Sequence, residues 1–135
     1  MINKSYLIEL GNIKSEQNGY LTIIENSNKI PFIVKRLFWT FQIPDNSVRG
    51  NHAHFKTEQV LIALNGEIKV RVEYPSSITE YYSLDHPSKA LYLPPNVWHT
   101  MEYTNNAIQL VLASSVFDES DYIREYENYK KIYSE

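Results

Sequence analysis

Histidines are the residues of this sequence best suited to proton transfer, because imidazole titrates near neutral pH and the chain contains no cysteine. Four are present, at positions 52, 54, 86 and 99. His52 and His54 are two residues apart, so on a β-strand their side chains leave the same face. Two imidazoles on one face need hydrogen-bond partners for four ring nitrogens, which an apolar core does not supply. The spacing therefore favours a functional pair.

Length and composition describe one domain covering residues 1–135. The chain has a mass of 15.8 kDa, with 43% apolar and 21% charged residues, which suits a single packed core. Thirteen basic and sixteen acidic residues give a net charge of −3, and no basic run suggests nucleic-acid binding. No apolar run approaches the ~20 residues of a membrane span, and the first residues lack a signal-peptide pattern. We therefore expect a cytoplasmic protein that binds neither nucleic acid nor membranes.

Short β-like runs separated by turn residues must position the histidines. Strands are expected over residues 6–10, 20–25, 35–43, 58–64, 67–72, 78–84, 90–93 and 107–113. The dipeptide Asn65-Gly66 separates two of these runs and predicts a hairpin. Many strands with little helix between them favour an all-β fold, an antiparallel sandwich or barrel.

A helix is expected only near the C-terminus. Asp118 is a candidate N-cap, and the run from there to about Tyr133 contains neither glycine nor proline. Tyr122, Tyr126, Tyr129 and Tyr133 would form one stripe of this helix. The pattern predicts a short helix that lays its tyrosine face on the barrel or on a second subunit.

Two segments resemble the motifs of the cupin superfamily, whose fold is a small double-sheet β-barrel or jelly roll. The first runs from Arg49 to Gln59, and the second is Leu93-Pro94-Pro95-Asn96-Val97-Trp98-His99. In metal-binding cupins the first motif supplies two histidines and an acid, and the second motif supplies a third histidine. His52, His54 and His99 match the histidine positions.

The acid of the metal-binding motif is missing at its usual place. Many metal cupins carry glutamate five residues after the second histidine, where this chain has Gln59. Glu58 is adjacent, so on a regular strand it faces the opposite side of the sheet. An amide is a poor ligand for a hard divalent cation, and the sequence therefore predicts a site without metal. A shorter spacing that accepts Glu58 occurs in some cupins, so a metal-binding cupin stays an alternative.

A narrower resemblance is to the nucleotide-sugar 3,4-ketoisomerases, which act on TDP-4-keto-6-deoxyglucose. It extends from about residue 20 to 130, and the matching segments are Ile30-Pro31-Phe32, Lys35-Arg36, 50–59, Gly66, 91–98, 110–114 and 117–124. Phe38-Trp39 stands where relatives often carry paired tyrosines, so a tyrosine proton shuttle there is not carried over. His99 is not uniformly histidine in that family, which favours a role in lining the cavity.

The resemblance implies an isomerase without a cofactor that moves a keto group from carbon 4 to carbon 3 of a hexose. Such a reaction needs two proton transfers through an enediol, which histidines near their usual pKa of ~6.5 can carry out. His52 and His54 are the expected catalytic pair, with His54 as the base at carbon 3. The expected substrate-binding residues are Arg36, Arg49, Gln59, Trp98 and His99, with the arginines suited to the diphosphate.

The resemblance also implies a homodimer, in which the N-terminal strand joins the partner's sheet and covers an exposed edge. The product would be transaminated to a TDP-3-amino-3,6-dideoxyhexose for lipopolysaccharide O-antigen, lipooligosaccharide or S-layer glycan. Family members give either the galacto- or the gluco-configured 3-keto sugar, and the sequence leaves both open. Two alternatives are a related nucleotide-sugar epimerase and a non-catalytic cupin that binds a sugar or a metal.

Overall fold

The computed structural model of the chain describes residues 3–26 and 29–134, and most of these residues lie in strands. The strands are β1 (Tyr6–Glu9), β2 (Ile13–Ser15), β3 (Gly19–Leu21), β4 (Arg36–Thr40), β5 (Val48–His54), β6 (Gln59–Glu73), β7 (Thr79–Leu84), β8 (Lys89–Leu93), β9 (Trp98–Ala113) and β10 (Tyr122–Ile123). A 3₁₀ turn, η1 (Glu119–Asp121), and a helix, α1 (Tyr126–Tyr133), lie near the C-terminus. The expected all-β fold is confirmed.

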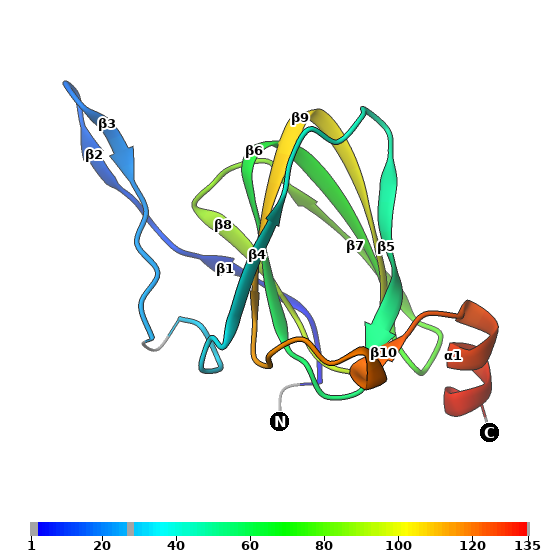
Figure 1. Cartoon of the computed structure of the whole chain (residues 1–135). Helices are drawn as coiled ribbons and strands as arrows, with labels where there is room; N and C mark the ends of the chain where they lie inside the picture. The colour runs from blue at the N-terminus through cyan, green and yellow to red at the C-terminus, as the bar shows by residue number, and fades with distance from the viewer. Residues whose placement is uncertain (1–2, 27–28, 135) are drawn as a thin grey trace.

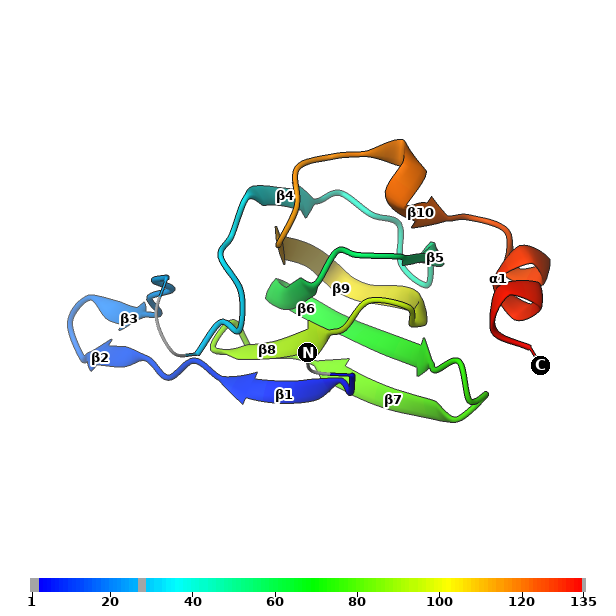
Figure 2. The same cartoon turned by 90° about the horizontal axis from the view of Figure 1, so that it is seen from below.

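The two longest strands, β6 and β9, form an antiparallel ribbon that belongs to two sheets. One half of the ribbon is flanked by β4 and β8, and β8 also pairs with β1. The other half is flanked by β5 and β7, and β5 also pairs with β10. Figure 2 shows β4, β9, β6, β8 and β1 side by side at one end of the molecule. This bent ribbon gives the double-sheet barrel that the cupin resemblance implies.

The predicted hairpin at Asn65-Gly66 is wrong, because β6 continues through both residues as a β-bulge. Gly66 has a φ of +72°, and a Cβ atom there would lie 2.6 Å from the carbonyl oxygens of Thr104 and Asn105. On the facing strand, Asn105 and Asn106 also have positive φ. The Asn-Gly signal for left-handed backbone was correct, but here it marks the place where two paired strands bend together.

Apolar side chains fill the space between the two sheets and also cover the outside of one of them. The inner cluster includes Leu61, Ile68, Val70, Leu84, Leu93 and Val111. The outer cluster includes Val60, Ile62, Tyr92 and Leu112, packed against Ile8, Leu10 and Ile30 of the N-terminal segment. Because this sheet is buried on both faces, the sequences of its strands are continuous apolar runs and do not alternate between apolar and polar residues.

The N-terminal region forms an arm that leaves the barrel. Strands β2 and β3 pair only with each other among the described strands, and Figure 1 shows their hairpin extending away from the body. The strand expected over 20–25 is shortened to Gly19–Leu21. Strand β1 pairs with β8 of its own chain and lies at the edge of the sheet.

The helix expected from Asp118 begins only at Tyr126. The side chain of Asp118 does act as a cap, but it accepts from the Ser120 backbone N–H at 3.0 Å and caps η1. Tyr122 then pairs with His54 of β5, so it belongs to the sheet and not to the tyrosine stripe. The first half of the expected helix is therefore absent from residues 118–125, because Tyr122 and Ile123 pair with the distant strand β5 instead.

Helix α1 packs on the end of the barrel, as expected for its tyrosine face. Tyr129 is buried, and its hydroxyl donates to the backbone carbonyls of Glu73 and Asn96, at 3.0 Å each. The buried Glu73 carboxylate accepts from the Tyr126 hydroxyl at 2.9 Å and from Lys130 Nζ at 3.1 Å. Among the described residues, no helix is long and apolar enough to cross a membrane.

Candidate active site

Three histidines come together inside the barrel. His52 and His54 lie on β5, and His99 lies opposite His52 on β9. The ring centroids of His52 and His54 are 5.1 Å apart, and those of His52 and His99 are 4.7 Å apart. His52 and His54 thus share a face, as their spacing predicts. Gly50, at φ +85°, allows the bulge before His52 and lets β5 approach the His99 backbone closely.

His52 and His99 are held by backbone carbonyls. The Nδ1 atom of His52 lies 3.1 Å from the Gly50 carbonyl oxygen, and that of His99 lies 3.4 Å from the Val97 carbonyl oxygen. A carbonyl oxygen only accepts hydrogen bonds, so each ring carries its proton on Nδ1. The Nε2 atom of each neutral ring is then unprotonated. Burial lowers the pKa of His52 to about 4 and that of His99 well below its usual value. Both rings are neutral at pH 7.

His54 faces a carboxylate instead of a carbonyl. Its Nδ1 atom lies 3.2 Å from Oδ2 of Asp121, and both side chains are buried. The Asp121 carboxylate also accepts from the Lys56 N–H at 2.8 Å, the Thr57 N–H at 3.3 Å and the Thr57 hydroxyl. Burial and the nearby His52 lower the pKa of His54, while Asp121 opposes this shift. The Nε2 atom of His54 is buried and has no hydrogen-bond partner among the described residues.

Sequence reasoning missed Asp121 because it placed this residue inside the predicted helix. The family resemblance of residues 117–124 could have indicated a role for Asp121, because a helix that only packs on the barrel does not explain that resemblance. The backbone carbonyl of Asp121 also accepts from the Phe55 N–H at 2.9 Å, which ties η1 to the end of β5.

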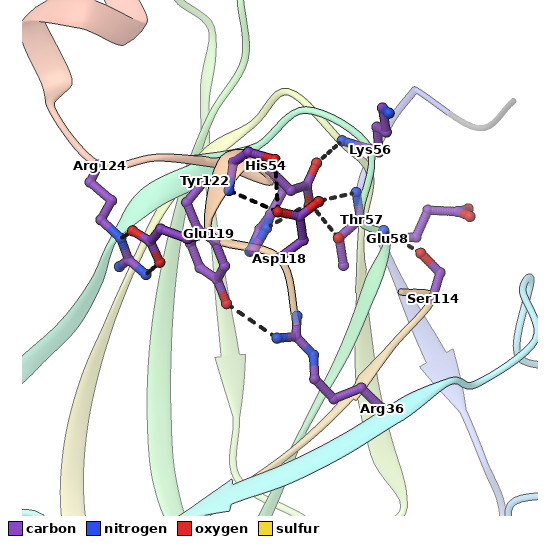
Figure 3. Close-up of polar contacts among 12 residues, drawn as sticks. Arg36, His54, Lys56, Thr57, Glu58, Ser114, Asp118, Glu119, Tyr122 and Arg124 are labelled. Carbon is purple, nitrogen blue, oxygen red and sulfur yellow. Dashed lines mark hydrogen bonds and ion pairs between the residues drawn. The ribbon is translucent and has the colours of Figure 1, made fainter. Parts of the chain in front are cut away.

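Tyr122 and Arg36 lie beside His54. The ring centroids of Tyr122 and His54 are 4.3 Å apart, and Arg36 Nη1 lies 3.5 Å from the Tyr122 hydroxyl (Figure 3). The guanidinium of Arg36 also lies over the rings of Phe38, at 5.4 Å, and Phe117, at 5.7 Å. Within residues 3–26 and 29–134, no carboxylate pairs with Arg36. This cation is therefore free to bind an anionic ligand.

A cavity of about 80 Å³ lies beside the histidines, and its polar lining comes from Arg49, His52, Gln59, His99, Tyr103 and Gln109. Gln59 and His99 are almost fully buried, while Arg49 is exposed at the rim. The Tyr103 hydroxyl donates to Oε1 of Gln109 at 2.6 Å. Gln59, Arg49 and His99 thus line the same cavity as His52.

The residues present do not fit the metal site of metal-binding cupins. Gln59 faces the cavity, whereas the Glu58 carboxylate accepts from the Tyr92 hydroxyl at 2.7 Å, away from the histidines. In the described part of the chain, no three histidine or carboxylate side chains are arranged to hold a metal ion.

Trp98 is not brought to the cavity. Its ring packs under α1, with centroids 5.3 Å from Tyr126 and 5.5 Å from Tyr129. Adjacent residues of a strand point to opposite faces, so placing His99 in the cavity places Trp98 outside it. The prediction that Trp98 binds substrate is corrected to a structural role in seating the helix.

The double-sheet barrel, with three histidines gathered at its interior, has the architecture of a cupin. A search of protein families matches residues 3–134 to the family described as FdtA, WxcM-like, C-terminal. The chain is also 42% identical over 117 residues to the TDP-4-oxo-6-deoxy-α-D-glucose-3,4-oxoisomerase of Aneurinibacillus thermoaerophilus, covering 86% of this chain and 84% of that protein. The protein belongs to this family of sugar 3,4-ketoisomerases.

Solved structures agree with this assignment. QdtA, a sugar 3,4-ketoisomerase from Thermoanaerobacterium thermosaccharolyticum in complex with TDP, is 39% identical with a TM-score of 0.89, and the match covers 98% of this chain and 96% of QdtA. WlaRB, a TDP-quinovose 3,4-ketoisomerase from Campylobacter jejuni, is 33% identical with a TM-score of 0.87, covering 96% of this chain and 99% of WlaRB. NovW, a 4-keto-6-deoxy sugar epimerase of Streptomyces spheroides, shares the fold at 16% identity and a TM-score of 0.75.

Proposed function

We propose that this protein converts TDP-4-keto-6-deoxyglucose into its 3-keto isomer. The observation that carries the proposal is the His54 imidazole, which is neutral, buried and backed by Asp121, with an Nε2 atom that lacks a partner in the described residues. The name of the Aneurinibacillus relative and the bound TDP of QdtA support the choice of a TDP-linked 4-keto sugar.

His54 and His52 would divide the proton transfers. His54 Nε2 takes the proton from carbon 3, which the neighbouring carbonyl acidifies, and the resulting His54 imidazolium then delivers a proton to carbon 4. The hydroxyl proton on the oxygen at carbon 3 must also pass to the oxygen at carbon 4. His52 suits this second transfer because its Nδ1 atom is held by Gly50, which leaves Nε2 for the sugar oxygens. One proton thus moves from carbon 3 to carbon 4 and another from the oxygen at carbon 3 to the oxygen at carbon 4, so the reaction requires no cofactor.

Arg36, Arg49, Gln59 and His99 would bind the substrate around this pair. We assign the two arginines to the diphosphate, because paired hydrogen bonds from guanidinium suit phosphate oxygens. Arg36 is supported by its position beside Tyr122 and by its lack of a carboxylate partner in the described ranges. The amide of Gln59 would donate a hydrogen bond to the enediolate oxygen inside the cavity.

Incubation with TDP-4-keto-6-deoxyglucose tests the proposal. The expected result is a 3-keto product, identified by the position of the carbonyl carbon in ¹³C NMR. An epimerase would leave the carbonyl at carbon 4 and invert a neighbouring centre. A non-catalytic cupin would bind the sugar and return it unchanged.

We also propose that the protein forms a homodimer through its arm and the outer face of β4. Leu37 and Trp39 are exposed on β4, and Tyr20 and Leu21 are exposed on the hairpin. Between the arm and the sheet lies a largely apolar groove of about 670 Å³. An isolated two-stranded hairpin is marginally stable in water, so it needs a surface to pack on. A two-fold axis would place each arm against the partner's exposed face.

Light scattering at micromolar concentration tests the dimer. The expected mass is twice the 15.8 kDa of one chain. Trp39→Glu should shift the protein toward monomer, whereas Tyr81→Glu, at an exposed site lining a different groove, should not. A monomer at this concentration contradicts the proposal.

A cytoplasmic location stays a prediction from the sequence. So do the absence of nucleic-acid partners and the use of the product for a 3-amino-3,6-dideoxyhexose.

A further inference from the structure

We infer that Thr40 and Gln109 bind the keto oxygen at carbon 4 of the sugar and stabilise the negative charge that this oxygen acquires when carbon 3 loses its proton. With Tyr103, these two residues form the floor of the cavity beside the histidines. The inference deepens the proposed function, from which it takes the substrate, and it does not depend on which imidazole accepts the proton. It rests on two buried donor groups that the fold leaves without a good acceptor.

Strand pairing places the two donors side by side. Strand β4 pairs with β9 so that Thr40 lies directly opposite Gln109. Residues opposite each other in an antiparallel pair point to the same face of the sheet, with Cβ atoms about 4.5–5.5 Å apart. Both residues line the cavity that His52 also lines. Thr40 and Gln109 therefore present their polar groups to the same space as an imidazole.

The Tyr103 hydroxyl fixes the orientation of the Gln109 amide. This hydroxyl lies 2.6 Å from Gln109 Oε1, and burial raises the pKa of Tyr103 to about 12, so it keeps its proton and donates. The amide nitrogen carries two N–H groups, and its hydrogen bond among the described residues is to Met101 Sδ, at 3.2 Å. Thioether sulfur is a weak acceptor. The buried Gln109 amide therefore has an N–H group available for a ligand.

The Thr40 hydroxyl is the second available donor. Its oxygen is buried and lies beside the Tyr103 hydroxyl, yet it has no hydrogen-bond partner in residues 3–26 and 29–134. Native proteins pair nearly all of their buried polar atoms. An unpaired hydroxyl that lines a cavity therefore indicates a polar ligand.

The ligand that suits two neighbouring donors is an oxygen that only accepts hydrogen bonds. On the hexose ring, the strongest acceptor of this kind is the keto oxygen at carbon 4. Carbon 4 lies across the ring from carbon 1, which carries the diphosphate. The charged diphosphate stays outside a cavity of about 80 Å³, so carbon 4 points inward and its oxygen reaches the floor.

The two donors also approach the sugar from a suitable direction. Thr40 and Gln109 belong to the sheet that contains β4, whereas His52 and His99 belong to the facing sheet that contains β5. A base removes the proton of carbon 3 perpendicular to the plane of the forming enediolate, while the lone pairs of the keto oxygen lie in that plane. Base and donors must therefore come from different sides. Donors fixed where charge develops lower the barrier, and the Gln59 amide then serves the oxygen at carbon 3.

Turnover of Thr40→Val, with Thr40→Ser and Thr100→Val as controls, gives the first test. Valine keeps the shape of threonine but removes the hydroxyl, and Thr100 lines a groove on the outside of the barrel. Thr40→Val should lower kcat roughly 10- to 100-fold, as for the loss of a hydrogen bond to a charged group, with TDP affinity unchanged. Thr40→Ser and Thr100→Val should retain turnover close to that of the wild type.

Stability separates this role from a structural one. The Thr40 hydroxyl has no partner to lose in the described part of the chain, so Thr40→Val should not lower the urea midpoint of unfolding. Gln109→Glu tests the other donor, because the new carboxylate still accepts from Tyr103 but has no N–H group. Its kcat should fall at least as far as that of Thr40→Val.

The ¹³C NMR spectrum of bound sugar reports the contact itself. A His52→Asn/His54→Asn double variant should bind TDP-4-keto-6-deoxyglucose, labelled at carbon 4, without converting it. Hydrogen bonds to a carbonyl oxygen move the carbonyl carbon resonance downfield, so the bound resonance should lie downfield of that of the free keto form. Adding Thr40→Val should move it part of the way back, and adding Thr100→Val should not.

Native kcat in Thr40→Val overturns the inference. So does a bound carbonyl resonance that Thr40→Val leaves unchanged, which is the result expected if the floor holds only water. If the double variant does not bind the sugar, the kcat of Thr40→Val decides. A protein that binds the sugar with the expected downfield shift but does not isomerise it supports the inference and contradicts the proposed function, whereas a wild type that neither binds nor isomerises the sugar overturns both.

Discussion

Acid should weaken the folded protein through His52. Burial lowers the pKa of this residue from 6.5 to about 4. Between these values the unfolded chain binds a proton at His52 that the folded protein does not, so stability falls as the pH falls. The slope approaches about 1.4 kcal/mol per pH unit, and the loss from pH 7 to pH 5 through this one residue is roughly 2 kcal/mol.

The perturbation is His52→Gln, which keeps a polar side chain in the cavity and removes the titrating ring. Urea unfolding of the wild type and the variant at pH 7 and pH 5, at one protein concentration, gives four free energies of unfolding. The variant should lose roughly 2 kcal/mol less than the wild type between the two pH values. Equal losses in both proteins would refute the argument that burial keeps His52 neutral.

Three further predictions concern other parts of the structure. Activity should survive exhaustive EDTA treatment, since Gln59 stands where metal cupins carry an acid; loss on chelation with recovery by one divalent ion contradicts this. Gly66→Ala should cost at least about 2 kcal/mol in urea unfolding, because the new Cβ meets two backbone carbonyl oxygens at 2.6 Å. Glu73→Gln should cost roughly 1–3 kcal/mol and speed proteolysis near α1, because Tyr126 and Lys130 lose a buried charged partner; unchanged cleavage would mean that Glu73 does not anchor the helix.

Strand periodicity predicted much of the site. A period of two put His52 and His54 on one face and separated Gln59 from Glu58, and both results follow from backbone geometry alone. The same rule, applied to the neighbours Trp98 and His99, excludes Trp98 from the cavity once His99 is placed there. The sequence alone could therefore have indicated that Trp98 lies outside the cavity.

Two features of the fold could not be predicted from the local sequence. Asn65-Gly66 signals positive φ, but a turn and a bulge both need it, and only the pairing of β6 with β9 decides between them. Residues 118–125 carry a helix pattern, yet Tyr122 and Ile123 pair with β5, which is far away in sequence. Asp121 reaches His54 only because that pairing forms, so its role could not be derived from the spacing of residues.

The position of deuterium in the product tests most directly the central claim that His54 moves the carbon-bound proton during a shift of the keto group from carbon 4 to carbon 3. In D₂O, the wild type should give a 3-keto sugar with deuterium at carbon 4. His54→Asn should still bind TDP but lose at least about 100-fold in turnover and in deuterium incorporation. A His54→Asn variant that isomerises and exchanges at the native rate would contradict the claim.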